Sequence, residues 1–95
     1  MPPPDVRIYT TEACGYCVRA KGLLESKGVA YEEVHFPRSD IEARMRLVEL
    51  TGRYTVPQIL IGGRPIGGWD DLSALDRAGE LDRLLGAGAG PSSPS

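Results

Sequence analysis

The sequence has few of the residues from which disulfide scaffolds and metal centres are built. Its 95 residues include two cysteines and a single histidine, His35. Two cysteines are too few for the several disulfides that hold small secreted scaffolds together. A structural zinc ion normally takes four ligands, and two cysteines with one remote histidine do not complete that set. The composition therefore disfavours both a disulfide-stapled scaffold and a resident metal ion.

Long hydrophobic runs and a strong excess of one charge are also absent. No apolar run approaches the ~20 residues needed to cross a bilayer. The first residues, Met1–Asp5, lack the charged and apolar regions of a signal peptide. The net charge is −2 and the basic residues are scattered, so no surface for nucleic acid is predicted. We therefore expect a cytoplasmic protein that binds neither membranes nor nucleic acid.

The two ends of the chain differ in composition from the rest. Three consecutive prolines fall within residues 1–4, and residues 86–95 consist of glycine, alanine, proline and serine. Such segments have little apolar surface to bury, so both are predicted to be disordered tails. Residues 5–85 are then expected to form one domain.

Hydrophobic spacing alternates between the strand and helix periods along residues 5–85. Gly62-Gly63 separates two short strand patterns and predicts a hairpin, which makes its strands antiparallel, whereas a strand–helix–strand unit makes its strands parallel. The expected order is β-α-β-α-β-β-α, with strands at 6–10, 30–36, 58–61 and near 65–66, and helices at 18–27, from Ser39 to Gly52 and from Asp70 to Leu85 with a break at Gly79. This order predicts an α/β protein with a thioredoxin-like fold, in which helices flank a four-stranded mixed sheet.

The second helix has a recognisable start signal. Ser39 and Glu42 have the S-x-x-E spacing of a capping box, in which each side chain satisfies a free backbone N–H of the other. Ile41, Met45 and Val48 recur at helical spacing. We therefore expect these three side chains on the buried face of the helix.

Cys14 and Cys17 are separated by two residues and lie between a predicted strand and a predicted helix. Thiol–disulfide exchange needs a thiolate nucleophile and a second thiol that can resolve the mixed disulfide. A helix start favours the thiolate, and the i, i+3 spacing places both sulfurs on one helix face. The pattern favours redox chemistry, with Cys14 as the exposed nucleophile and Cys17 as the buried resolving thiol. Half a zinc site and two inert cysteines are the alternatives, and His35 is expected to be an ordinary sheet residue.

Two further segments carry features of a ligand site. Thr55-Val56-Pro57 precedes the third predicted strand, and Ile66-Gly67-Gly68-Trp69-Asp70-Asp71 leads into the last helical region. Glycines without Cβ atoms allow a ligand to approach the backbone closely, and the helix start that follows favours a carboxylate. The same residues also fit a plain turn in which Asp70 caps the helix, and the sequence does not separate the two interpretations.

Taken with Tyr9-Thr10 and Cys14-Gly15-Tyr16-Cys17, these segments resemble the glutaredoxin family, closest to its small bacterial dithiol type. The resemblance covers nearly all of the predicted domain. It implies a glutathione-dependent thiol–disulfide oxidoreductase that reduces protein disulfides and glutathione mixed disulfides through Cys14 and Cys17. The implied partners are glutathione, as co-substrate, and disulfide-containing or glutathionylated proteins, and the implied state is a monomer.

The resemblance also implies a set of glutathione-binding residues. Pro57 corresponds to the cis-proline that faces the active site, and Val56 would pair through its backbone with the cysteinyl part of glutathione. Asp70 would pair with the γ-glutamyl ammonium group. From the residues alone, Pro57 also fits a loop proline and Tyr16 a packing residue. The implied set is Tyr16, Thr55, Val56, Pro57, Gly68, Trp69 and Asp70.

Three positions depart from the usual pattern of the family. Thr11 stands where a lysine is common, and Arg53 is a candidate to supply part of the missing charge. Trp69 stands where a small residue is common. Gly15 replaces a common proline, as in members in which a dimer holds a [2Fe–2S] cluster through the nucleophilic cysteine and glutathione thiolates. Cluster binding through Cys14 is therefore the alternative function, although the presence of Cys17 fits the oxidoreductase better.

Overall fold

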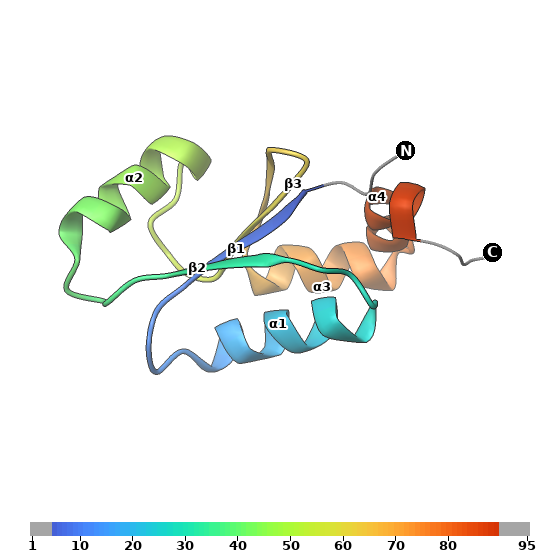
Figure 1. Cartoon of the computed structure of the whole chain (residues 1–95), viewed down its shortest axis with the longest axis horizontal. Coiled ribbons are helices and arrows are strands. Elements are labelled where there is room, and N and C mark those ends of the chain that lie inside the picture. The colour runs from blue at the N-terminus through green and yellow to red at the C-terminus, as the bar shows by residue number, and fades with distance from the viewer. Residues whose placement is uncertain (1–4, 90–95) are drawn as a thin grey trace.

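Four short strands form a mixed sheet at the centre of the computed structural model, which describes residues 5–89 (Figure 1). The order across the sheet is β2-β1-β3-β4. β1 runs parallel to β2 and antiparallel to β3, and β4 runs antiparallel to β3. The predicted thioredoxin-like arrangement is thus confirmed. The strands are β1 (Val6–Thr10), β2 (Glu32–His35), β3 (Gln58–Ile61) and β4 (Arg64–Gly67).

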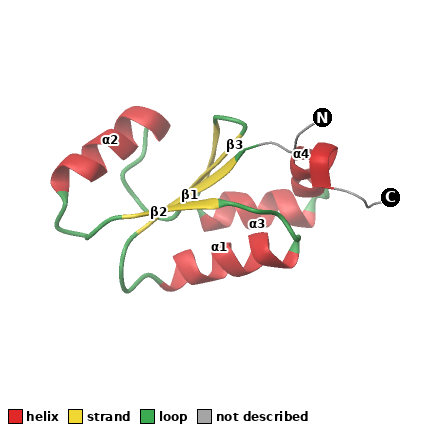
Figure 2. Ribbon diagram, in the orientation of Figure 1, coloured by secondary structure: helices red, strands yellow, loops and turns green. Residues whose placement is uncertain are grey.

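Four helices surround the sheet, namely α1 (Gly15–Ser26), α2 (Ile41–Thr51), α3 (Trp69–Arg77) and α4 (Glu80–Ala89). α1 and α3 lie side by side on one face, and α2 lies on the other (Figure 2). α3 and α4 are separated at Gly79, whose φ is 77°, as the sequence predicted. Within residues 5–89, no helix has the length and apolar character needed to cross a membrane.

The expected tails fall mostly outside the part of the chain that the structure describes. This applies to residues 1–4 and 90–95. α4, however, continues to Ala89 and so enters the segment 86–95 that composition alone had assigned to a tail.

The main hydrophobic core lies between the sheet and the three helices α1, α3 and α4. Strand alternation turns every second residue of β1 toward this layer, where burying one large aliphatic side chain contributes about 1.5–3 kcal/mol. Cys17 is buried in the same region of α1. The core cluster consists of Val6, Ile8, Ala20, Leu24, Ile59, Ile61, Leu72, Leu81 and Leu85.

The start of α2 differs from the prediction. Asp40, not Ser39, is the N-cap residue, and its Oδ1 accepts a hydrogen bond from the backbone N–H of Ala43 at 3.0 Å. Ser39 and Asp40 both precede the helix, and both side chains are able to cap it. Spacing to Glu42 favoured the serine, whereas the structure uses the aspartate.

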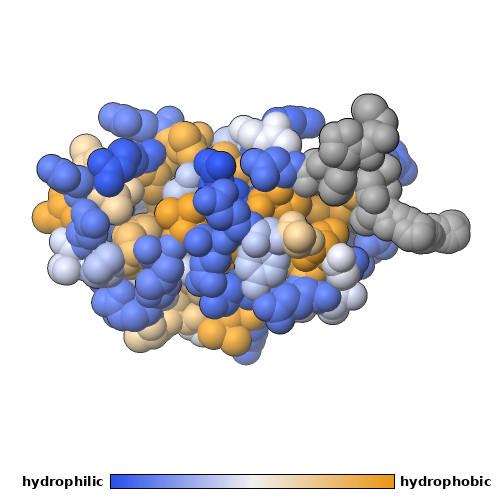
Figure 3. Space-filling view, in the orientation of Figure 1, coloured by the Kyte–Doolittle hydropathy of each residue, from blue (hydrophilic) through white to orange (hydrophobic). Residues whose placement is uncertain are grey.

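The buried face of α2 also differs from the prediction. Ile41 and Met45 are 73% and 58% exposed, Val48 is half-buried, and Leu47 is 1% exposed. α2 has apolar residues on two faces, so periodicity alone does not decide which one packs. Contact with the sheet selects the face that carries Leu47. Hydrophobic residues consequently reach the surface at the end of the molecule formed by α2 (Figure 3).

Truncation of the two α2 faces should affect stability unequally. Leu47→Ala is expected to lower the free energy of unfolding by about 2–5 kcal/mol, because it leaves a cavity in a packed layer. Ile41→Ala removes an exposed side chain and should change it by no more than about 0.5 kcal/mol. Urea denaturation followed by circular dichroism measures both. Equal losses would show that the buried face of α2 is assigned wrongly.

Candidate active site

Cys14 lies where the loop after β1 enters α1, and it is the N-cap residue of that helix. Its Sγ accepts a hydrogen bond from the backbone N–H of Cys17 at 3.2 Å. Ala13, just before it, has a φ of 55°, a left-handed conformation that costs a non-glycine residue roughly 1–2 kcal/mol. Backbone N–H groups at a helix start favour negative charge on the capping atom. The position therefore suits a nucleophilic thiolate at Cys14.

Cys17 occupies the opposite environment one helical turn further on. Both cysteines are free thiols, but Cys14 is partly exposed whereas Cys17 is only 2% exposed. Burial, reinforced by a hydrogen bond with Cys14, raises the pKa of Cys17 to about 12. At neutral pH, Cys17 is thus a protonated thiol shielded from solvent, as the sequence predicted for the second cysteine.

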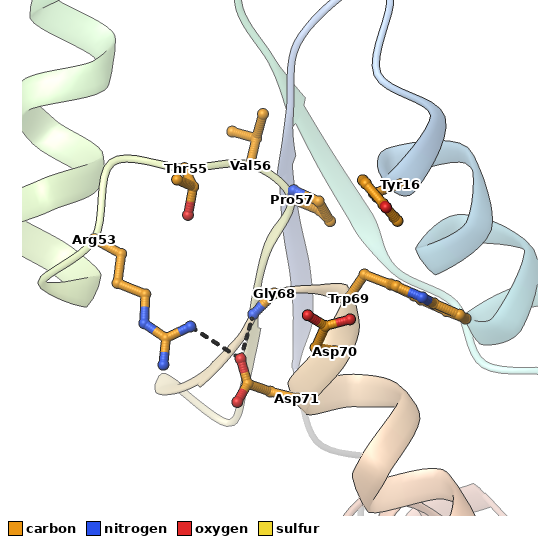
Figure 4. Close-up of a pocket in the computed structure, with 9 residues that line it drawn as sticks. All are labelled: Tyr16, Arg53, Thr55, Val56, Pro57, Gly68, Trp69, Asp70 and Asp71. Carbon is orange, nitrogen blue, oxygen red and sulfur yellow. Dashed lines mark hydrogen bonds and ion pairs between the residues drawn. The ribbon is translucent and has the colours of Figure 1, made fainter.

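A pocket of about 250 Å³ opens between the start of α1, the segment before β3 and the start of α3 (Figure 4). The Sγ of Cys14 lies 3.9 Å from the carbonyl oxygen of Val56, which is in the pocket wall. All of the residues that the resemblance implied for glutathione are brought together here, and Arg53 and Asp71 join them. The lining consists of Tyr16, Arg53, Thr55, Val56, Pro57, Gly68, Trp69, Asp70 and Asp71.

The segment between α2 and β3 forms one wall of the pocket. The Val56–Pro57 peptide bond is cis, as the resemblance implied. Behind the wall, Gln58 is buried and its Nε2 donates a hydrogen bond to Thr55 Oγ1 at 3.2 Å. The first residue of β3 thus fixes the loop that carries Thr55.

The start of α3 forms the opposite side. Asp71 Oδ2 accepts hydrogen bonds from the Gly68 backbone N–H at 3.0 Å and from Arg53 Nη1 at 2.9 Å. The Gly68 N–H, followed by the Arg53 guanidinium, lowers the pKa of Asp71. A Cβ on Gly67, whose φ is 122°, would overlap the Asp71 carboxyl group, and one on Gly68 would lie 3.1 Å from the Pro57 carbonyl oxygen. The positive φ and the Asp71 carboxyl group therefore require glycine at position 67, whereas a side chain at position 68 would crowd the Pro57 carbonyl.

Two charged residues of the pocket lie outside the predicted glutathione-binding set. Asp71 was not predicted at all, and Arg53 was named only as a candidate cation. Asp71 stands at the third position of α3, where its carboxylate returns to the Gly68 N–H, but Gly68-x-x-Asp71 does not match the S/T-x-x-E/Q capping box, so that motif does not reveal it. Arg53 lies in the lining and supplies a cation there. Thr11, at the usual lysine position, is buried and adds no charge.

Two aromatic side chains complete the pocket in different ways. Tyr16 is exposed, and Arg19 Cζ lies 5.6 Å from its ring centroid in a cation–π arrangement. The i, i+3 spacing of the two residues is the sequence signal for this pair, which was missed. The ring of Trp69 points away from Arg53 toward α1 (Figure 4), and Trp69 also packs against the core.

His35 is a sheet residue at the end of β2, and its Nδ1 lies 2.9 Å from the hydroxyl of Thr10. Across residues 5–89, no group of three or more histidine, cysteine, aspartate or glutamate side chains is placed to hold a metal ion. Residues 5–89 therefore contain no complete set of side-chain ligands for a metal ion.

A partly exposed thiol at a helix start, a buried thiol one turn later and a thioredoxin-like sheet together define a thiol–disulfide redox protein. The glutaredoxin family model matches residues 6–66, and the chain belongs to the glutaredoxin family. Family and fold support thiol–disulfide oxidoreductase activity.

Individual relatives agree with this assignment. The chain is 53% identical over 84 residues to a glutaredoxin from Pseudomonas aeruginosa, covering 88% of this chain and 99% of that protein. It is 51% identical over 81 residues to glutaredoxin 3 from Escherichia coli, covering 85% and 96%. The crystal structure of a buckwheat glutaredoxin–glutathione complex is similar, with a TM-score of 0.79, 34% identity, and coverage of 88% of this chain and 78% of that one.

The difference between the two thiols predicts their order of alkylation. Iodoacetamide at pH 7 should modify Cys14 first, because a pKa of about 12 keeps Cys17 protonated and burial shields it. Peptide mapping by mass spectrometry of the reduced protein measures the two rates. In urea, where burial is lost, both cysteines should react at similar rates. Faster modification of Cys17 in the folded protein would refute the assignment.

Proposed function

We propose that this protein is a glutathione-dependent thiol–disulfide oxidoreductase that reduces protein disulfides and glutathione mixed disulfides. The pocket beside the Cys14 sulfur is the observation that carries the proposal, because it gathers residues from α1, the loop before β3 and the start of α3. The similar buckwheat structure, a complex with glutathione, supports the choice of ligand. We further propose that the protein acts in the cytoplasm as a monomer.

The pocket offers partners for the cysteinyl part, the ammonium group and the two carboxylates of glutathione. The backbone of Val56, close to the Cys14 sulfur, suits the cysteinyl part, which would lie along it as an added strand. Asp70 suits the γ-glutamyl ammonium group, and the N–H groups of Trp69 and Asp70 in the first turn of α3 suit its carboxylate. Arg53 provides a positive charge for the remaining carboxylate.

The proposed reaction has two routes. With a glutathionylated protein, the Cys14 thiolate attacks the glutathione sulfur, and the protein thiolate leaves and takes up a proton. A second glutathione thiolate then attacks the Cys14 mixed disulfide, which releases oxidised glutathione and restores Cys14. With a protein disulfide, the Cys14 thiolate attacks one sulfur to form a mixed disulfide, and the other protein thiolate leaves and takes up a proton. Cys17 then loses its proton and attacks the Cys14 sulfur, which forms the Cys14–Cys17 bond and releases the second protein thiol. Two glutathione molecules later reduce the Cys14–Cys17 bond, which restores both thiols and yields oxidised glutathione.

Cluster binding is the competing function. Within the described residues, Cys14 is the partly exposed cysteine and Cys17 is buried, so a [2Fe–2S] cluster would have to take its other thiolates from glutathione and a second chain. Gly15 was the reason for this alternative, and a Cβ at Gly15 would meet no atom within 4 Å. Packing therefore does not require glycine at this position, and the buried thiol of Cys17 fits the oxidoreductase better.

Single cysteine variants separate the two routes of the proposed reaction. Cys14→Ser should abolish reduction of a glutathionylated peptide, because it removes the nucleophile. Cys17→Ser should retain that activity and lose most of the turnover with a protein disulfide, because the mixed disulfide is no longer resolved. Both are measured by coupling oxidised glutathione to NADPH consumption with glutathione reductase.

A Cys14→Ser variant with wild-type turnover would overturn the role assignment. The wild-type protein serves as the test of the function itself. If it fails to turn over the peptide, yet becomes a brown dimer after anaerobic addition of iron, sulfide and glutathione, the cluster function replaces the proposed one. Visible absorption and gel filtration record that outcome.

A further inference from the structure

Gln58 is a polar residue in a buried position directly behind the pocket wall. It is the first residue of β3, it follows Pro57, and it is only 1% exposed. Its Nε2 donates a hydrogen bond to Thr55 Oγ1 at 3.2 Å. Its Oε1 is also buried, and it has no hydrogen-bond partner among the residues that the structure describes. Gln58 itself does not line the pocket.

The unpaired oxygen makes glutamine an unfavourable residue for this position on packing grounds. A buried acceptor without a donor destabilises a folded protein, and an apolar side chain of similar length avoids that loss. The rest of β3 is apolar and buried, namely Ile59, Leu60 and Ile61. The hydrogen bond to Thr55 therefore explains a glutamine here better than packing does.

The hydrogen bond from Gln58 determines which role the Thr55 hydroxyl can take. A threonine hydroxyl has one proton to donate and lone pairs that accept. Because Thr55 Oγ1 accepts from Gln58, its own proton is left for another acceptor, and it donates to no other described residue. With the amide reversed, Oε1 would take up that proton and Nε2 would be buried without a partner. Unpaired buried N–H groups are rarer than unpaired carbonyl oxygens, so Thr55 is the donor.

The Thr55 hydroxyl lies on the side of the pocket from which a ligand enters. Thr55 is exposed, and its oxygen is directed into the space between Arg53 and Gly68 (Figure 4). A hydroxyl donor close to an arginine suits a carboxylate, because hydrogen bonds to charged acceptors are stronger than those between neutral groups. A Cβ on Gly68 would lie 4.0 Å from Gln58 Nε2, so the amide also borders the opposite wall of the pocket.

We propose that Gln58 is a positioning residue for glutathione, whose amide holds Thr55 so that the threonine hydroxyl donates to the carboxylate on the Arg53 side of the pocket. Gln58 acts through Thr55 and does not itself touch the ligand. The inference rests on the proposed function, in which the glutathione part of a mixed disulfide occupies the pocket. Gln58 consequently contributes to the discrimination between glutathione and thiols that carry no carboxylate.

Single-turnover reaction with two mixed disulfides of one peptide measures this contribution. Excess reduced protein is mixed with the peptide carrying either glutathione or 2-mercaptoethanol, which has no carboxylate, and chromatography follows consumption at several protein concentrations. Gln58→Met should raise the half-saturation concentration for the glutathionylated peptide about three- to tenfold, the effect of one hydrogen bond, and keep the maximal rate within about twofold. Consumption of the mercaptoethanol peptide should change by less than about twofold, because it offers no charged acceptor.

Further variants separate positioning from a structural role. Thr55→Val should raise the half-saturation concentration to a similar extent, and adding Gln58→Met to it should change little, because the two residues act as one unit. Leu60→Met places the same new side chain on the same face of β3, away from the pocket, and should keep the preference for glutathione. The urea midpoint of Gln58→Met should equal or exceed that of wild type, because the unpaired oxygen is removed.

An unchanged half-saturation concentration in Gln58→Met would overturn the proposal, as would equal losses with both peptides or additive effects in the double variant. A lower urea midpoint or loss of folding would also overturn it, because the amide would then be needed for the fold. Failure of the proposed function appears differently. In that case the wild-type protein itself would consume both mixed disulfides equally well, or neither.

Discussion

The packing of α1 on the sheet determines the chemistry of the two sulfurs. Ala20 and Leu24 are completely buried against a layer that includes Ile8 of β1. Because Cys17 precedes Ala20 by three residues, the helical period carries its sulfur into the same buried layer. Cys14, three residues earlier still, falls at the helix start and at the edge of the core. One packed helix face thus produces an accessible sulfur next to free N–H groups and a buried one that keeps its proton.

The register of the sheet assembles the pocket around that helix start. Tyr9 of β1 is opposite Gln58 of β3, so Pro57, just before β3, lies next to the end of β1 from which the chain continues to Cys14. Ile59 is opposite Gly67 of β4, and this pairing places Gly68 against the Pro57 carbonyl. The antiparallel pairings of β1 with β3 and of β3 with β4 therefore bring together residues that are more than forty positions apart in sequence. The backbone thus sets the shape of the pocket, and the side chains line it.

Sequence analysis succeeded where the signal was local. Strand alternation, the Gly62-Gly63 hairpin and the helix break at Gly79 each follow from a few neighbouring residues, and the structure has all three. It failed on the buried face of α2, because two apolar faces compete there and contact with the sheet decides between them. Sequence analysis also could not predict that Arg53 pairs with Asp71, because the two residues come together only after β3 and β4 have paired.

The Arg53–Asp71 pair links the two sides of the pocket through contacts within the protein itself. Asp71 satisfies the Gly68 N–H, which would otherwise be left half-buried and unpaired at the helix start, and Arg53 donates one hydrogen bond to the same carboxylate through Nη1. Gly67 and Gly68 leave space for that carboxylate, so the start of α3 is ordered when the protein folds. A ligand that enters then meets oriented backbone groups and loses less free energy to rearrangement.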